Sequence, residues 1–194
     1  MKEHPILFSG EMVQAIQEGR KTQTRRVIKP QPNTLWDAAK FIGEDGFRFY
    51  CHIDPHIFVD WKCPYGQSGD GLWVREAWRP IDEDRPVNRL MAGDTIYYRA
   101  DYVGEALGGK WRPSIHMPRW ASRINLEIVN IRVERVQEIH PMDCIAEGAT
   151  DWDNLLSLDT HILRFHNLWD KINLKRGYGW EVNPWVWIIE FKAL

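Results

Sequence analysis

The sequence predicts a single α+β domain, residues 1–194, whose core is formed mainly by strands. Two segments that open with Gly-Asp, GDGLWVREAW at 69–78 and GDTIYYRAD at 93–101, continue with the two-residue alternation of strands. The last residues, PWVWIIEFKAL, alternate in the same way. Apolar residues at helical spacing occur between these segments, so we expect helices to flank the strands. A chain of 194 residues is long enough for one sizeable core.

The first predicted helix follows a short apolar run near the N-terminus. Met12, Val13 and Ile16 recur at helical spacing. Ser9 is a plausible N-cap, and Gly19 suits the position after the helix end. The segment GRKTQTRR, residues 19–26, therefore begins where this helix ends.

Two segments are predicted to be long loops or insertions. Residues 30–67 contain prolines at 30, 32, 55 and 64 and show little periodicity. Residues 101–119 contain glycines and prolines that forbid a regular element over most of their length, together with several Trp and Arg. The regular core should therefore lie outside these two segments.

A strand with a change of phase is predicted in RINLEIVNIRVERV. One parity carries Ile124, Leu126 and Ile128, and the other carries Val129, Ile131 and Val133. Such a slip indicates a bulge or a bend, which is common where a sheet curls.

Two further helices are predicted before the terminal strand. Pro141 suits the first turn of a short helix that Gly148 closes, which puts Glu147 in its last turn. A longer helix should follow, with one apolar stripe. The stripe consists of Leu155, Leu158, Ile162, Phe165, Trp169 and Ile172.

Composition predicts a reduced cytoplasmic protein with no membrane partner. The three cysteines are an odd number, and no stretch has the length of a membrane span or a secretory signal core. Nothing in the sequence indicates an obligatory protein partner.

Cysteine and histidine spacing does not favour a metal site. Cys51, His52, His56 and Cys63 lack the close cysteine pairs of common structural zinc sites, so we expect no bound metal. Cys144 lies on the short predicted helix and is expected to be a buried apolar residue.

Positive charge is concentrated in one segment. The chain has 25 Lys and Arg against 27 Asp and Glu, a formal charge of −2. Arg20–Lys29 holds five cations and no acid, so the remainder carries −7 by subtraction. Any affinity for nucleic acid must come from this local patch.

The residue types in GRKTQTRR suit three different roles. A lysine beside hydroxyls and arginines offers a proton acceptor, a nucleophile and anion anchors. A solvated basic turn after a helix is the simpler interpretation. If the segment is extended, Lys21 and Thr24 fall on opposite faces, and a joint role then needs an irregular turn.

The motifs at both ends resemble the ASCH family. Gly19, Lys21 and Arg26 match its signature G-x-K-x-x-x-x-R after the first helix, and GRKTQTRR with the terminal IIEFKAL resembles the N4-acetylcytidine amidohydrolases of that family. The resemblance implies a PUA-like mixed β-barrel with flanking helices. Segments 30–67 and 101–119 would be insertions into it.

The resemblance also implies a metal-independent amidohydrolase without a cofactor, acting on an N-acylated nucleobase or nucleoside such as N4-acetylcytidine. It assigns Lys21 as proton acceptor, Thr24 as nucleophile and Glu147 as proton donor. A carboxylate at the C-terminal end of a helix is biased toward its protonated form. Arg25 and Arg26 would lower the pKa of Lys21 by repulsion, or anchor the substrate.

Further substrate-pocket candidates come from other segments. Glu76 shares strand parity with Leu72 and Val74, so it either faces the pocket or pairs with an arginine of the signature. Arg119 and Trp120 offer a cation and a ring face for a base or phosphate, or else pack the loop onto the sheet.

Two rival functions use the same basic patch. PUA-like folds include RNA readers, so the chain is alternatively an RNA-binding module with RNA as its partner. A ribonuclease that uses Arg20–Lys29 is the third alternative.

Overall fold

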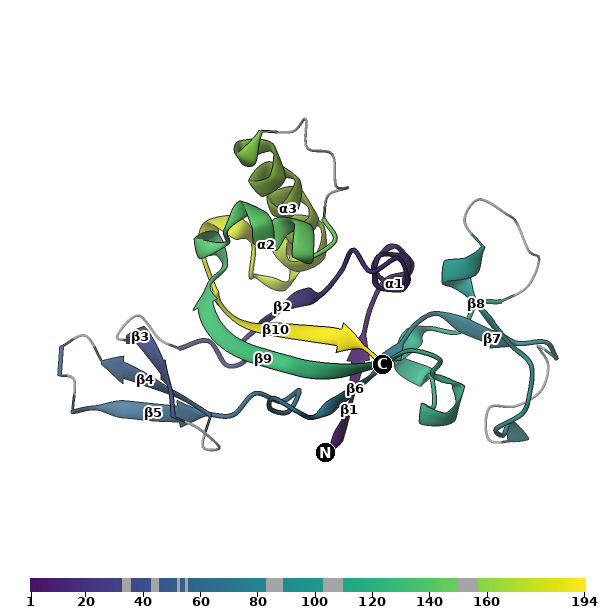
Figure 1. Ribbon diagram of the computed structural model, residues 1–194. Helices are drawn as coiled ribbons and strands as arrows, with labels where there is room; N and C mark the ends of the chain where they lie inside the picture. The colour runs from purple at the N-terminus through teal and green to yellow at the C-terminus, as the bar shows by residue number, and fades with distance from the viewer. Residues whose placement is uncertain are drawn as a thin grey trace.

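The computed structural model describes residues 1–32, 36–42, 46–51, 53–54, 56–82, 89–102, 110–149 and 157–194. It confirms the α+β class, with a curved sheet at the centre and helices packed beside it (Figure 1). Within these ranges, no helix is long and apolar enough to cross a bilayer.

The central sheet has five strands in the order β1-β6-β9-β10-β2. Their bounds are Glu3–Leu7 (β1), Gly71–Arg75 (β6), Asn125–Arg135 (β9), Trp185–Ala193 (β10) and Gln23–Val27 (β2). β1 runs parallel to β6, and every other neighbouring pair is antiparallel.

The sheet is open, so the predicted closed barrel is wrong. β1 and β2 form its two edges, and no backbone ladder joins them in the part of the chain that is described. A side chain bridges the two edges instead, because Arg26 of β2 donates from Nη2 to the Leu7 carbonyl at the end of β1, 2.6 Å away. A cavity lies between the two edges, where a ladder between β1 and β2 would otherwise run.

The predicted phase slip in the long strand is a β-bulge. In the β9–β10 ladder, Glu190 pairs with Asn130 and Phe191 pairs with Ile128, so Val129 has no partner. Val129 is 50% exposed while Ile128 is fully buried. The extra residue therefore turns the later part of β9 so that its other parity faces the core.

The segment 30–67 is not a long loop, which corrects the prediction. It contains an antiparallel sheet of β3 (Trp36–Phe41), β4 (Phe47–Cys51) and β5 (Phe58–Trp61). Phe47 and Phe49 of β4 lie edge-on against Trp187 and Trp185 of β10. Strands this short show little periodicity in a sequence, and the ring contacts supply the stability that the local pattern does not indicate.

The segment 101–119 has little regular structure in its described part, residues 101–102 and 110–119. It contains the end of one short 3-10 turn, a second at Ser114–His116 and an isolated bridge between Arg112 and Trp78. The bridge joins it to a small sheet of β7 (Trp78–Pro80) and β8 (Ile96–Tyr98). The single strand expected over 72–78 is therefore two strands that break at Glu76.

The two short helices agree with the sequence prediction. α1 spans Gly10–Gln17 with Ser9 as N-cap, and Gly19 follows it with φ +72°. α2 spans Pro141–Ala146, and Gly148 has φ +70°. Both glycines adopt the left-handed conformation that ends a helix at little steric cost.

The long helix, α3 (Leu158–Asn173), is rotated relative to the predicted stripe. Phe165 and Trp169 are buried as expected, but Leu158 is 63% and Ile172 46% exposed. His161 and Asn173 are buried in their place. Leu155 lies outside the described residues. α3 packs through this face against α2 and the start of β10, and that contact selects which side is buried.

Candidate active site

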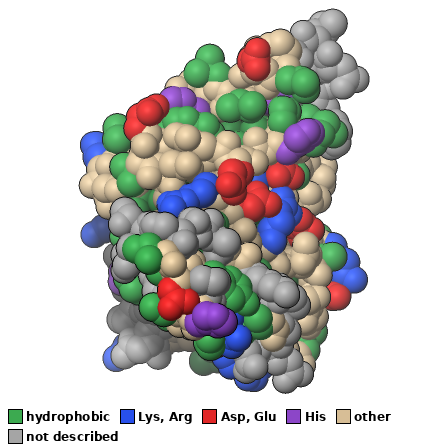
Figure 2. All heavy atoms as spheres, turned by 90° about the vertical axis from the view of Figure 1, so that its left-hand side faces the viewer, with side chains coloured by type: hydrophobic (Ala, Val, Ile, Leu, Met, Phe, Trp, Pro, Cys, Tyr) green, Lys and Arg blue, Asp and Glu red, His purple; other side chains and the backbone are tan. Residues whose placement is uncertain are grey.

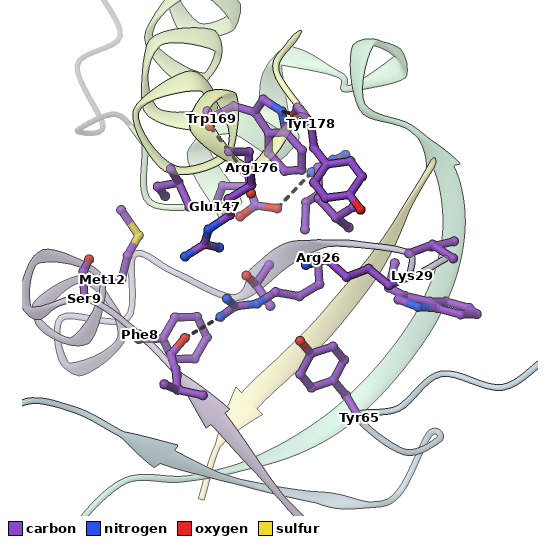
Figure 3. Close-up of a pocket in the computed structure, with 18 of the residues that line it drawn as sticks. Phe8, Ser9, Met12, Arg26, Lys29, Tyr65, Glu147, Trp169, Arg176 and Tyr178 are labelled. Atoms are coloured by element: carbon purple, nitrogen blue, oxygen red, sulfur yellow. Dashed lines mark hydrogen bonds and ion pairs between the residues drawn. The ribbon is translucent and has the colours of Figure 1, made fainter. Parts of the chain in front are cut away.

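A cavity of about 770 Å³ lies between the two edges of the open sheet. Its walls come from the end of β1, from β2, from α3 and from Glu147, which directly follows α2 (Figure 3). Five of the residues singled out in the sequence line it: Lys21, Thr24, Arg25, Arg26 and Glu147. The structure therefore brings together the three candidate reacting groups.

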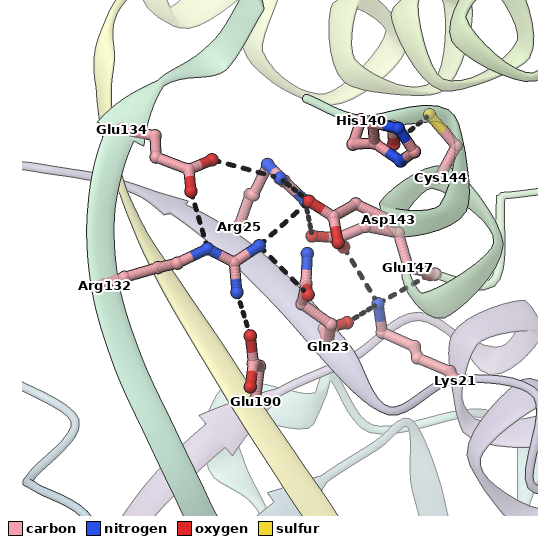
Figure 4. A network of polar contacts seen from close by, with 10 residues as sticks. All are labelled: Lys21, Gln23, Arg25, Arg132, Glu134, His140, Asp143, Cys144, Glu147 and Glu190. Atoms are coloured by element: carbon pink, nitrogen blue, oxygen red, sulfur yellow. Dashed lines mark hydrogen bonds and ion pairs between the residues drawn. The ribbon is translucent and has the colours of Figure 1, made fainter. Parts of the chain in front are cut away.

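Lys21 is 4% exposed, and its ammonium group is fully engaged (Figure 4). Nζ donates to the Gln23 carbonyl at 2.7 Å, to the Glu147 carbonyl at 2.7 Å and to Glu147 Oε2 at 3.2 Å. Burial lowers the pKa of Lys21, Glu147 opposes that shift, and Arg26 and Arg25 add to it. The predicted repulsion by the arginines is present, but desolvation is the larger cause.

An irregular turn puts Lys21 and Thr24 on the same cavity, which is the condition that a joint role would need. The backbone N–H groups of Arg20 and Lys21 both donate to the Ala15 carbonyl, and Thr22 N donates to the Ala146 carbonyl. β2 begins only at Gln23. Lys21 is therefore outside the strand alternation that would have pointed it away from Thr24.

Thr24 is 4% exposed and lies opposite Ile189 in the β2–β10 ladder. Its side chain lines the cavity, and within the described residues no hydrogen bond is made by its hydroxyl. The hydroxyl is thus available to a ligand.

Glu147 directly follows α2 as its C-cap residue, but the helix end does not dominate its surroundings. Oε2 contacts Lys21 Nζ, and Oε1 accepts from Arg25 Nη1 at 3.1 Å. The carboxylate therefore contacts two cations, one through each oxygen.

Arg25 holds this arrangement in place rather than facing a ligand freely. It is 5% exposed, and its Nη2 donates to Asp143 at 2.9 Å and lies 3.6 Å from Glu134. Arg132 of β9 reaches the same Asp143 oxygen at 2.9 Å (Figure 4). The network joins β2, β9 and α2, and it positions Glu147 against Lys21.

The interpretation of GRKTQTRR as a solvated basic turn is wrong. Lys21 and Arg25 are buried in ion pairs, and Arg20 pairs with Glu18. On the face shown in Figure 2, Lys and Arg side chains of the described residues lie among Asp and Glu side chains. Because Lys21 and Arg25 are buried and Arg20 is paired with Glu18, the Arg20–Lys29 patch is not a continuous basic surface.

Three other candidates do not line the cavity, which corrects the expectation of a shared pocket. Glu76 is 1% exposed and pairs with Arg123, not with an arginine of the signature. Arg119 pairs with Glu3, and the Trp120 ring packs edge-on against Trp78. Glu76 is buried on the same parity as Leu72 and Val74, as the alternation predicted, but its carboxylate meets Arg123 and not the cavity.

Sequence reasoning missed several cavity residues. Lys62, Tyr65, Arg176 and Tyr178 line it beside Lys29. They come from a turn after β5 and from the segment after α3, where no motif marks them. Only their residue types, cations next to rings, resemble the pattern that drew attention to Arg119 and Trp120.

The cysteines show no reactive environment. Cys144 is fully buried, and burial raises the pKa of its thiol to about 12. Burial likewise raises the pKa of Cys63 to about 12. His52 lies outside the described residues. Among the residues that the structure describes, no group of three or more possible metal ligands occurs.

Comparison of the chain with protein-family models, with curated proteins and with solved structures found no match in any of the three. The resemblance to the ASCH family therefore stays a prediction based on the two motifs.

Proposed function

We propose that this chain is a metal-independent amidohydrolase acting on an N-acylated nucleobase or nucleoside, with N4-acetylcytidine as the test substrate. The observation that carries the proposal is that Lys21, Thr24 and Glu147 line one cavity, with Lys21 and Glu147 in direct contact. A base, a nucleophile and an acid are the groups that acyl transfer needs. The ASCH resemblance supports the same assignment.

In the proposed reaction, Lys21 Nζ accepts the proton of the Thr24 hydroxyl as Oγ1 attacks the acyl carbonyl. The C–N bond then breaks, the leaving amine takes a proton from Glu147, and the acyl group stays on Thr24 as an ester. Water hydrolyses the ester, which releases the carboxylic acid and restores the hydroxyl.

This chemistry requires a neutral Lys21 and a protonated Glu147 at the same time. Transfer of one proton across the 3.2 Å contact between Nζ and Oε2 supplies both forms. Burial lowers the pKa of Lys21, which favours its neutral form. Arg25 opposes the transfer through its bond to Oε1. A carbonyl ligand whose binding shifts this proton transfer toward neutral Lys21 and protonated Glu147 would initiate the reaction.

The RNA-binding and ribonuclease alternatives have less support. Both relied on a basic surface over Arg20–Lys29, and most of its charge is directed into ion pairs or the cavity. A binding module would shift RNA with strong salt dependence and leave nucleosides unchanged. A ribonuclease would cut the strand without metal.

The test is release of cytidine from N4-acetylcytidine by purified full-length protein, with and without EDTA. We expect turnover that EDTA does not affect. Thr24→Val keeps the shape of the side chain and should reduce the rate by about 100-fold or more, while Thr24→Ser should retain most of it. Thermal melting of each variant confirms that it is folded.

Full turnover by Thr24→Val would overturn the role of the hydroxyl. Absence of turnover by the wild-type protein, together with RNA binding or scission, would favour the alternatives. Loss of turnover in EDTA that zinc restores would overturn the metal-independent mechanism.

A further inference from the structure

Four cations line the cavity outside the Lys21, Glu147 and Arg25 network: Arg26, Lys29, Lys62 and Arg176. Glu147 is the single carboxylate among the described lining residues, and it is already held by two cations. Lys29, Lys62 and Arg176 make no ion pair within the described ranges. The whole chain has a formal charge of −2, so this concentration of unneutralised positive charge is a feature of the cavity alone and not of the chain as a whole.

Arg26 is the innermost of the four cations. Its Nη2 donates to the Leu7 carbonyl, but its Nε is buried without a hydrogen-bond partner. Burial lowers the pKa of the Arg26 guanidinium. Tyr65 and Glu147 oppose that shift, and the like charge of Arg176 adds to it. Arg26 and Arg176 line the same cavity, and an anion bound between them would reduce the repulsion of their like charges.

Aromatic rings flank the cations. Lys29 Nζ lies 5.2 Å from the centre of the Tyr178 ring, and the Arg26 guanidinium lies 5.1 Å from that of Phe8. Tyr65 and Tyr178 lie on opposite sides of the cavity, with Arg26 between them (Figure 3). Flat rings beside cations match a ligand that has both a planar base and a negative group.

We propose that the cavity binds a nucleoside monophosphate, with the phosphate held by Arg26, Lys29, Lys62 and Arg176 and the acylated base directed toward Thr24. The identity of the base rests on the proposed amidohydrolase function, whereas the phosphate rests on the unpaired cations. A dianionic phosphate suits several convergent donors better than a neutral ribose does. The cavity, about 770 Å³, is within the range that holds a ligand of this size.

A mononucleotide fits better than a polymer. Cavity walls lie on both sides of Arg26, formed by Phe8, Ser9 and Met12 on one side and by Tyr65 on the other (Figure 3). A polymer would need a basic path leading out of the cavity, and the Arg20–Lys29 patch does not provide one because Arg20 and Arg25 are paired with acids.

The test compares binding of cytidine, cytidine 5′-monophosphate and a short oligocytidine to the full-length protein by titration calorimetry. We expect the monophosphate to bind about tenfold or more tightly than cytidine. The double variant Lys29→Gln/Arg176→Gln should remove most of that difference, since both side chains are exposed and the fold should tolerate the change. Arg164→Gln, an exposed cation of α3 that does not line the cavity, is the matched control and should leave the difference intact.

Equal affinity for cytidine and its monophosphate would overturn the proposal, and so would an equal loss in Arg164→Gln. Binding of oligocytidine more than tenfold tighter than the monophosphate would show that the cations read a polymer, which also overturns it. Competition by inorganic phosphate alone, weaker in the double variant, would support it.

The outcomes separate this proposal from the proposed function. If the monophosphate binds preferentially but neither N4-acetylcytidine nor its 5′-monophosphate is cleaved, the phosphate site stands and the amidohydrolase fails. If N4-acetylcytidine is cleaved without any preference for the phosphorylated form in rate or binding, the reverse holds.

Discussion

Glu147 and Glu76 are both buried carboxylates that contact cations, yet their surroundings differ. Glu147 is shared between Lys21 and Arg25 and lines the cavity. Glu76 accepts two bonds from Arg123, at 2.9 and 3.1 Å, and does not line it. Arg123 also pairs with Asp101 and lies 4.0 Å from the centre of the Tyr98 ring. In this Glu76 cluster, formed by Glu76, Arg123, Asp101 and Tyr98, the side chains contact one another and none of them lines the cavity.

The difference shows that burial and pairing do not by themselves make a site. Both carboxylates satisfy the requirement that a buried charge be paired. Only Glu147 also contacts a lysine and lines a cavity that a threonine hydroxyl shares and that has space for a ligand. Glu76 joins the break after β6 to the 3-10 turn Arg99–Asp101 through Arg123, so we assign it a structural role.

The largest effect on turnover and stability is expected from replacing the Glu147 carboxylate by an amide. Glu147→Gln should lower turnover of N4-acetylcytidine by about 100-fold or more, since it removes the proton donor. It should also cost about 3 kcal/mol of stability, because Lys21 and Arg25 lose a charged partner. Urea unfolding and steady-state kinetics measure the two effects.

Glu76→Gln is the matched variant for this comparison. It should cost a similar free energy of unfolding, because Arg123 loses its bidentate partner, while turnover stays within about twofold of wild type. A loss of activity equal to that of Glu147→Gln, in a folded protein, would remove the distinction between the two clusters.

A smaller effect is expected from adding a methyl group behind Lys21. Gly148 has φ +70°, and a Cβ there would lie 3.1 Å from Ala15 Cβ and 3.2 Å from Lys21 Cβ. Gly148→Ala should therefore cost about 2–3 kcal/mol and lower turnover, because it strains the backbone and displaces Lys21.

Gly69→Ala is the control for backbone strain alone. Gly69 has φ +85°, and a Cβ there would meet nothing within 4 Å. It should cost about 1 kcal/mol and leave turnover unchanged. If both variants lose the same stability and neither loses activity, the packing of Gly148 against Lys21 has no functional role.

The two clusters should also differ in the pH dependence of stability. Burial raises the pKa of Glu76 above 4.5, so the native state binds the extra proton and stability falls as pH rises through the interval above 4.5. Burial lowers the pKa of Lys21 below 10.5, so stability rises with pH through the interval below 10.5.

Urea unfolding across both pH intervals measures the two slopes. Glu76→Gln should remove the acidic slope alone, and Lys21→Met the alkaline slope alone. A slope that survives its own substitution would show that another group produces it.

The smallest effect is expected at the sequence candidates that lie outside the cavity. Arg119→Gln removes an exposed ion pair with Glu3, which contributes little in water. Its melting temperature and turnover should match those of the wild type. Reduced turnover with unchanged stability would return Arg119 to the substrate pocket.

Much of the fold was predictable because its signals are local. Gly19 ends the first helix, and Pro141 and Gly148 limit the second, through backbone preferences that depend on nearest neighbours. The bulge at Val129 was visible as a change of parity. The sheet inside 30–67 was not predicted, because its short strands are stabilised by contacts with Trp185 and Trp187 far along the chain.

The candidate site, like the fold, was only partly predictable from the sequence. The sequence by itself determined that a lysine and a threonine stand three residues apart after a helix, next to two arginines. Tertiary structure decided that Glu147, 126 residues away, contacts Lys21, and that Glu76 does not. Tertiary structure also left β1 and β2 without a backbone ladder between them, and a cavity lies between these two edges. The physical reason is that caps and alternation act over a few residues, whereas ion pairing, desolvation and strand pairing depend on which distant segments pack together.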